Sequence, residues 1–164
     1  MHSWPLVLGA ALLLGACAHP WNTVNVAPGT PRSEVIARAG QPVRAVPLPG
    51  GGERLQYTLQ PMGQHAFMVD LDPTGRVVRT RQVLTAQEFA RIEEGRWTLQ
   101  DVEREFGPPA RVDGVSSFRG SVLTYRWRDQ GGGDMFYWVY VDPQGVVRRA
   151  HPGMEHFNAP NDRD

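Results

Sequence analysis

The chain of 164 residues contains one sequence pattern twice, and this internal repeat limits the folds open to it more than any other feature. Four residues recur 67 positions later: Val35 as Val102, Gly40 as Gly107, Pro42 as Pro109, and Arg44 as Arg111. The match continues at an offset of 68 from Leu55, Tyr57 and Leu59 to Leu123, Tyr125 and Trp127, and at 70 from Asp72-Pro73-Thr74-Gly75 to Asp142-Pro143-Gln144-Gly145. Two copies of one supersecondary unit are therefore expected.

Each copy is predicted to begin with a short helix. Thr30 followed by Pro31 predicts an N-cap and a proline at the first helical position, where no amide donor is needed. In the second copy Thr98 is the N-cap, and Asp101 can reach back to it. A glycine then ends each helix, and a proline two positions later prevents it from resuming: Gly40 with Pro42, and Gly107 with Pro109.

A further helix is predicted between the copies. Thr85 and Glu88 have the spacing of a capping box, and Leu84 and Phe89 that of a hydrophobic staple. We expect this helix to run to about Glu94.

Alternating apolar residues predict the strands. The segment 55–59, the segment 67–71 and the Val- and Thr-rich segment 76–84 form the first set. Asp-Pro-x-Gly predicts a tight hairpin, because Pro fixes φ at the second turn position and Gly supplies positive φ at the fourth. The expected fold is α+β, with two tandem repeats of a helix plus a three-stranded antiparallel meander and the helices packed on one face of the sheet.

The N-terminus has the features of a bacterial lipoprotein signal peptide. An apolar run from Leu6 to Leu14 leads through Gly15-Ala16 to Cys17, the sole cysteine, and this order resembles the lipobox in which the cysteine is acylated. An ordinary signal peptide with Cys17 left as a free thiol is the alternative. The expected organisation is a signal peptide (1–16), a tether (17–28), a first repeat (29–84), a second repeat (85–150) and a disordered tail (151–164).

Composition narrows the choice of partners. Seventeen basic and seventeen acidic residues cancel, so the chain has no electrostatic reason to bind nucleic acid. With one cysteine, no intramolecular disulfide can form, and stability must come from packing.

Comparison of the two copies points to an interaction surface. If Tyr137, Val139 and Val141 face the helices, the opposite face carries Phe136, Trp138 and Tyr140, whereas the first copy has Ala66, Met68 and Asp70 there. On the neighbouring strand Arg126 and Arg128 also point outward, where arginine can stack on aromatic rings. We expect these five residues to bind a partner: Arg126, Arg128, Phe136, Trp138 and Tyr140. The alternative is that the two sheets join or fold over each other and Trp138 belongs to the core.

Catalytic and metal sites are not indicated by the sequence. His65, His151 and His156 lack the spacing of metal ligands within one element. Asp70 and Asp72 alternate toward a turn in which Asp72 has a structural task, and no nucleophile motif such as Gly-x-Ser-x-Gly is present. We therefore expect no enzyme activity, no cofactor and no metal.

The lipobox, Gly29-Thr30 followed by Val35, Gly40-x-Pro42, and the strand ending in Asp72-Pro73-x-Gly75 together resemble the BamE family of small outer-membrane lipoproteins, also called SmpA or OmlA. The tandem form resembles the superfamily that includes the β-lactamase inhibitor protein. The resemblance implies a periplasm-facing, non-catalytic lipoprotein with palmitate on Cys17 that binds protein partners, such as the machinery for β-barrel assembly. Ala18 rather than Asp after the cysteine implies the outer membrane. The alternative is a periplasmic inhibitory module.

Overall fold

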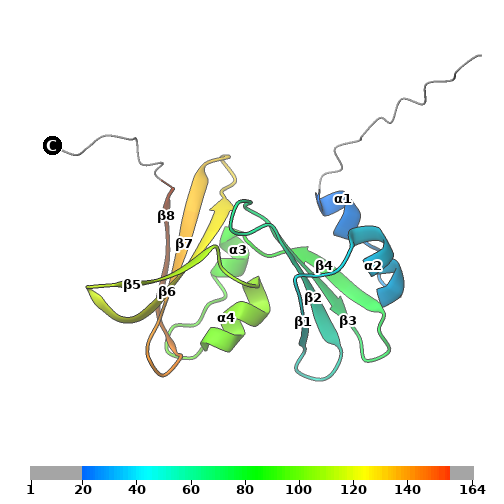
Figure 1. Ribbon diagram of the computed structural model, residues 1–164, viewed down its shortest axis with the longest axis horizontal. Coiled ribbons are helices and arrows are strands. Elements are labelled where there is room, and N and C mark those ends of the chain that lie inside the picture. The colour runs from blue at the N-terminus through cyan, green and yellow to red at the C-terminus, as the bar shows by residue number, and fades with distance from the viewer. Residues whose placement is uncertain (1–19, 156–164) are drawn as a thin grey trace, which may run out of the picture.

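The computed structural model describes residues 20–155, and Cys17 and the predicted signal peptide lie outside this part of the chain. The fold is α+β, with short helices and two separate four-stranded antiparallel sheets (Figure 1). The first half comprises α1 (Pro20–Val24), α2 (Arg32–Ala39), β1 (Arg44–Pro47), β2 (Glu53–Thr58), β3 (Ala66–Leu71) and β4 (Val77–Gln82). The second half comprises α3 (Ala86–Phe89), α4 (Leu99–Phe106), β5 (Arg111–Val115), β6 (Phe118–Arg128), β7 (Asp134–Val141) and β8 (Val147–Met154).

Each sheet is a meander, so strands that follow one another in sequence pair in space, in the orders β1-β2-β3-β4 and β5-β6-β7-β8. The α+β prediction is confirmed, but each sheet has four strands where the sequence predicted three. The unpredicted strands, β1 and β5, lie at the edges of the sheets with mostly exposed side chains. They therefore lack the apolar alternation from which the other strands were recognised.

The C-terminal strand β8 extends to Met154, so the predicted tail 151–164 begins too early. In the ladder His151 pairs with Trp138, and Gly153 pairs with Phe136. In the sequence, Pro152 favours a disordered tail because proline has no backbone N–H to donate. Strand β8 lies at the edge of its sheet, where a proline is tolerated.

The helix ends follow the predictions in part. The capping box of Thr98 and Asp101 is present, and Gly40 and Gly107 end their helices with φ of 80° and 77°. In the first half the N-cap is Pro31, one residue later than predicted, because the hydroxyl of Thr30 donates to the carbonyl of Ala27 instead.

Helix α3 is shorter than predicted and ends at Phe89. Its N-cap Thr85 accepts from the amide of Glu88, but the reciprocal half of the capping box is replaced, because the Glu88 carboxylate pairs with Arg81 and Arg91. Leu84 and Phe89 are both fully buried in the same core, as the staple predicted.

The same hydrogen bonds recur in both halves. Tyr57 donates to the carbonyl of Gly40 at the end of α2, and Tyr125 donates to that of Gly107 at the end of α4. The two Asp-Pro-x-Gly turns also match: Asp72 and Asp142 accept backbone amides in each, and Gly75 and Gly145 have φ of 77° and 80°. In each half the residue just before the second helix forms an isolated bridge with the residue just before the fourth strand: Pro31 with Arg76, and Thr98 with Val146.

The elements stack in layers (Figure 1). Helices α1 and α2 cover one face of the first sheet, and α3 and α4 lie between the two sheets. The smaller core lies under α2, around Val35, Leu55 and Val69. The prediction of helices on one face holds for the second sheet, whereas the first sheet has helices on both faces.

The larger core lies between the sheets and is rich in aromatic rings. Phe89 of α3 is stacked on Tyr137 of β7 with 4.0 Å between the ring centroids, and it contacts Phe106 of α4 at 4.9 Å. Ala66 and Met68 of the first sheet belong to the same core and are fully buried. The helix pair α3–α4 therefore supplies apolar contacts to both sheets at once.

Candidate functional site

The face of the second sheet that points away from α3 and α4 carries the aromatic residues that the sequence predicted. Tyr137, Val139 and Val141 are buried toward the helices, and the residues that alternate with them on β7 are partly exposed: Phe136, Trp138 and Tyr140. The two sheets do not pair with each other, and Trp138 is not part of either core cluster. The alternative in which Trp138 is a core residue does not apply.

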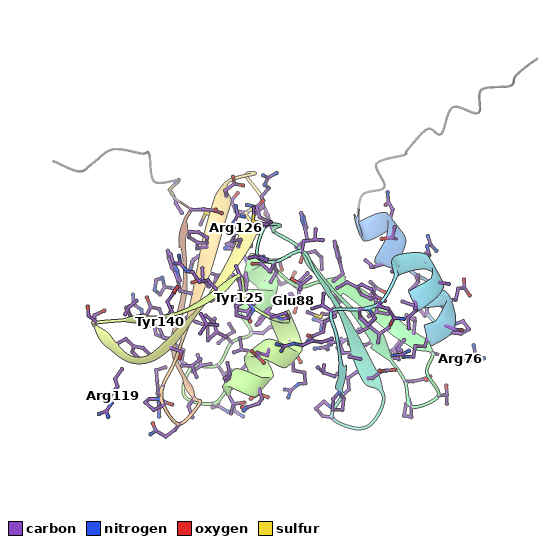
Figure 2. The ribbon with its side chains drawn as sticks, viewed as in Figure 1. Arg76, Glu88, Arg119, Tyr125, Arg126 and Tyr140 are labelled. Carbon is purple, nitrogen blue, oxygen red and sulfur yellow. The ribbon has the colours of Figure 1, made fainter. Side chains whose placement is uncertain are left out.

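The register places the outward residues of the neighbouring strands beside these rings. We call this side of the sheet the aromatic face, and it comprises Val122, Thr124 and Arg126 of β6, Phe136, Trp138 and Tyr140 of β7, and Arg149, His151 and Gly153 of β8. Val122 and Thr124 are themselves buried. Tyr140 lies on the outer side of the sheet in Figure 2, whereas Tyr125 points into the interior.

The rings on the aromatic face contact one another in a chain. Centroids are 5.7 Å apart between Phe136 and Trp138, 5.3 Å between Trp138 and His151, and 5.5 Å between His151 and Tyr140. Phe118 is the last ring in this series and contacts Tyr140 edge to face, with 5.3 Å between the centroids. Because these contacts hold each ring in place, little side-chain entropy remains to be lost when a partner covers them.

Gly153 makes room for Trp138 on the aromatic face. A Cβ atom added to Gly153 would lie 2.2 Å from Cζ3 of the Trp138 ring, so the indole rests directly on the backbone of β8. The sequence prediction missed this, because it assigned residues 151–164 to a tail.

Arg126 does not stack on Trp138 as the sequence suggested, because its guanidinium binds a carboxylate and two backbone carbonyls instead. Its guanidinium pairs with the Glu155 carboxylate at 2.7 Å and donates to the carbonyls of Pro61 and Met62 in the loop between β2 and β3. Arg126 therefore fastens a loop of the first half to the second sheet. Figure 2 shows it at the end of the sheet nearest that loop.

Gln60 of the same loop completes the edge of β6 where β5 has ended. Its side-chain amide donates to the Arg126 carbonyl at 2.7 Å and accepts from the Arg126 amide at 3.1 Å, which are the two bonds a neighbouring strand would make. Nothing in the local sequence signalled this contact, because it joins residues 66 positions apart.

The remaining predicted arginine, Arg128, is exposed and pairs with Asp134 at 2.9 Å across the hairpin between β6 and β7. The cation–π contact of the aromatic face is made by Arg149, whose Cζ lies 5.3 Å from the centroid of Tyr140. A comparison of equivalent strands could have found it, since Arg149 is opposite Tyr140 in the ladder. The sequence alone did not assign a partner strand to residues 147–154, and so it did not place Arg149 opposite Tyr140.

The outer edge of β8 is closed to a further strand. The amide of Ala150 donates to the side chain of Glu94 at 2.8 Å, and Pro152 has no amide to donate. A partner would therefore contact this end of the sheet through its face rather than by strand addition.

The equivalent face of the first sheet is covered and holds a buried ion pair. Arg54 binds Asp70 through two bonds of 2.5 and 3.0 Å and reaches Glu105 of α4 at 2.9 Å. Burial alone would raise the pKa of Asp70, but hydrogen bonds from Arg54 and Arg79 hold it below the usual value. Asp70 is thus a paired structural carboxylate and not a poised general acid.

A cleft of about 510 Å³ opens beside this ion pair, between the β1–β2 loop and the β3–β4 turn. Its charged lining comprises Arg54, Asp70, Asp72, Arg79 and Glu105. Asp72 accepts three bonds in the hairpin turn and has a lowered pKa, chiefly from the Arg76 amide, as its predicted structural task requires. The cleft therefore presents paired charges rather than an acid–base couple.

Neither a metal-binding cluster nor a membrane-spanning helix is found in the described part of the chain. Among the described residues, no three His, Cys, Asp or Glu side chains are grouped so that they could hold a metal ion. Within residues 20–155 no helix has the length and apolar character needed to cross a membrane.

Comparisons with known proteins are sparse. No protein-family model matches the chain, and a search of curated proteins finds no match. Among solved structures, a DUF4309 family protein, YjgB from Bacillus subtilis, is similar to this chain with a TM-score of 0.32 and 18% identity. That match covers 77% of this chain and 79% of the other, and a likeness this low supports no conclusion about function.

Proposed function

We propose that this protein is a non-catalytic lipoprotein, anchored by an acyl group on Cys17 to the outer membrane and facing the periplasm, that binds protein partners. We propose further that it is a BamE-like accessory of β-barrel assembly or envelope integrity. The chain in this proposal consists of two tandem copies of one unit, as the matching tyrosine, turn and bridge contacts of the two halves support.

The observation that carries the proposal is the aromatic face. Phe136, Trp138 and Tyr140 remain partly exposed on the second sheet, whereas Ala66 and Met68 on the corresponding face of the first are fully buried. Tryptophan and tyrosine beside arginine are enriched at interaction hot spots, and a contiguous apolar surface marks a contact site.

The proposal that the protein is non-catalytic is supported by the protonation state of its carboxyl groups. Arginines lower the pKa of the buried Asp70 carboxyl and of the half-buried Glu88 carboxyl. In Glu88 burial opposes ionisation, but bonds from Arg81 and Arg91 outweigh it. Groups that stay ionised at neutral pH supply no general acid, and carboxylates whose oxygens already accept from arginines are poor general bases.

The test is recovery of partners from membranes with the full acylated chain. We expect Trp138→Ala to abolish recovery of the partner while the protein stays folded by circular dichroism. Val78→Ala is the matched control, because Val78 is 53% exposed on the first sheet and lies outside the aromatic face. Components of β-barrel assembly among the lost proteins would support the envelope role, and a periplasmic enzyme would favour the inhibitory module. Unchanged recovery by folded Trp138→Ala would refute the proposal.

The lipid anchor has its own test. Palmitate labelling of cells that express the chain is expected to mark the native protein and not Cys17→Ser. An unlabelled native protein would refute the anchor while leaving the binding surface untouched.

A further inference from the structure

Some arginines on and beside the aromatic face are paired with carboxylates, and others are not. Arg126 is neutralised by Glu155 at 2.7 Å, and on β5 Arg111 is paired with Asp113. Both β5 residues lie opposite outward residues of β6 and so share this side of the sheet. Arg149 is exposed and takes part in no ion pair within residues 20–155. Among the residues that make up the aromatic face, Arg149 is therefore the cation without an ion pair; Arg119, next to Phe118 on β6, is a further exposed arginine with none among the described residues.

Arg149 is also held in place before any partner arrives. Its guanidinium lies over the ring of Tyr140 at 5.3 Å, and that ring is itself fixed by His151, nearly parallel at 21°, and by Phe118, edge-on at 88°. A guanidinium held over an aromatic ring by cation–π attraction still has N–H donors free for a planar acceptor. A carboxylate matches that fork through two parallel hydrogen bonds.

The approach to this group is across the sheet. Glu94 occupies the amide of Ala150, and Pro152 offers none, so the edge beside Arg149 does not accept a strand. The ligand must therefore place its carboxylate over β8 while its apolar groups cover Trp138 and Phe136.

We infer that the aromatic face binds a protein segment in which an Asp or Glu lies next to apolar side chains, with the carboxylate on Arg149 and the apolar groups on Trp138 and Phe136. This inference rests on the proposed function and adds the chemistry of the partner.

A nucleic acid would also offer negative charge and stacking, but the surface fits it less well. Binding to a phosphate backbone draws on several unpaired cations at once, and here Arg126 and Arg111 are already neutralised. Of the unpaired arginines, Arg149 is the one that lies over a ring of the aromatic face, and one guanidinium suits one carboxylate.

The experiment compares three labelled probes by fluorescence anisotropy on the full acylated chain in detergent. They are a short peptide of alternating Leu, Glu and Phe, the same peptide with Lys for Glu, and oligo-dT of similar length. We expect the acidic peptide to bind at least about tenfold more tightly than the basic one, and the preference to shrink as salt is raised. We also expect Arg149→Glu to abolish the preference.

The matched control is Arg76→Glu. Arg76 is exposed at the opposite end of the molecule, as Figure 2 shows, and its replacement changes the net charge by the same amount. We expect this variant to keep the preference for the acidic peptide, which separates a local contact from a general effect of charge.

Several results would overturn the inference: no binding of the acidic peptide, equal binding of the two peptides, tighter binding of oligo-dT, or a preference that survives Arg149→Glu. Its failure can be told apart from that of the proposed function. If Trp138→Ala abolishes recovery of the partner from membranes while the peptides show no preference, the aromatic face stands and the carboxylate inference fails. If folded Trp138→Ala changes neither recovery nor peptide binding, the proposed function fails.

Discussion

Replacing Asp70 by Asn tests how the two halves are held together. The Arg54 and Asp70 side chains are only 2% and 5% exposed and are joined by two hydrogen bonds, so water can reach a partner left behind only through the cleft beside the pair. Removing one member of a buried ion pair costs about 3–5 kcal/mol. Because Arg54 retains Glu105 at 2.9 Å, we expect the lower end, about 3 kcal/mol.

The assay is urea unfolding followed by circular dichroism, together with the melting temperature. For a domain of this size about 3 kcal/mol corresponds to a fall of roughly 6–12 °C. The control is Arg79→Ala, since Arg79 binds the other side of Asp70 at 2.8 Å but is 55% exposed. We expect that change to cost less than about 1 kcal/mol, because water replaces the lost partner.

A double variant completes the test. Arg54→Met with Asp70→Leu removes both charges of the pair. Glu105 then loses Arg54 but keeps Arg104 at 3.5 Å and Arg81 and Arg91 at 3.6 Å. We therefore expect the double variant to cost less than Asp70→Asn, about 1–2 kcal/mol. If Asp70→Asn costs less than about 1 kcal/mol, or if the double variant is no more stable than the single one, the reasoning from desolvated charge is wrong.

Three further predictions follow from the structure. Asp70 and Glu88 have lowered pKa values in the folded state. The stability they contribute is therefore present above their unfolded pKa of about 4 and is lost as the pH falls through their folded pKa values. We expect the urea midpoint of unfolding to be constant from about pH 5 to 7 and to fall below about pH 4. Gly153→Ala places a Cβ at 2.2 Å from the Trp138 ring and should cost about 1–3 kcal/mol, with a change in tryptophan fluorescence; native-like emission would contradict the close contact. Gln60→Ala leaves the β6 edge open and should cost about 1–2 kcal/mol, with faster hydrogen exchange at the Arg126 amide, whereas unchanged exchange would exclude the edge contact.

The sequence was most informative where structure is local. The turns at Asp72 and Asp142, the capping box of Thr98 and the outward direction of Trp138 each depend on residues within a few positions, and all are present. Apolar alternation located β2 and β3, Val and Thr content indicated β4, and the repeat carried the same three strands into the second half. Apolar alternation missed β1 and β5 because their exposed side chains leave no apolar signal.

The candidate site was predicted in its rings and not in its polar contacts. Phe136, Trp138 and Tyr140 follow from alternation along one strand, but the partners of Arg126 lie in a loop more than 60 positions away and at Glu155. A guanidinium can reach many acceptors, and the choice among them is made by tertiary packing. For the same reason the arginine that stacks on Tyr140 proved to be Arg149 and not one of those predicted.

The layer order accounts for the difference between the two sheets. Helices α3 and α4 bury Met68 of the first sheet on one side and Tyr137 of the second on the other, so one helix pair serves two faces. No described helix follows β8, and no helix or strand within residues 20–155 covers the last face of the stack. In a stack that ends in this way, polar outward residues would suffice for solubility. The presence of Phe136, Trp138 and Tyr140 there instead, held by ring contacts and by the space at Gly153, is what a surface requires when its covering layer comes from another protein.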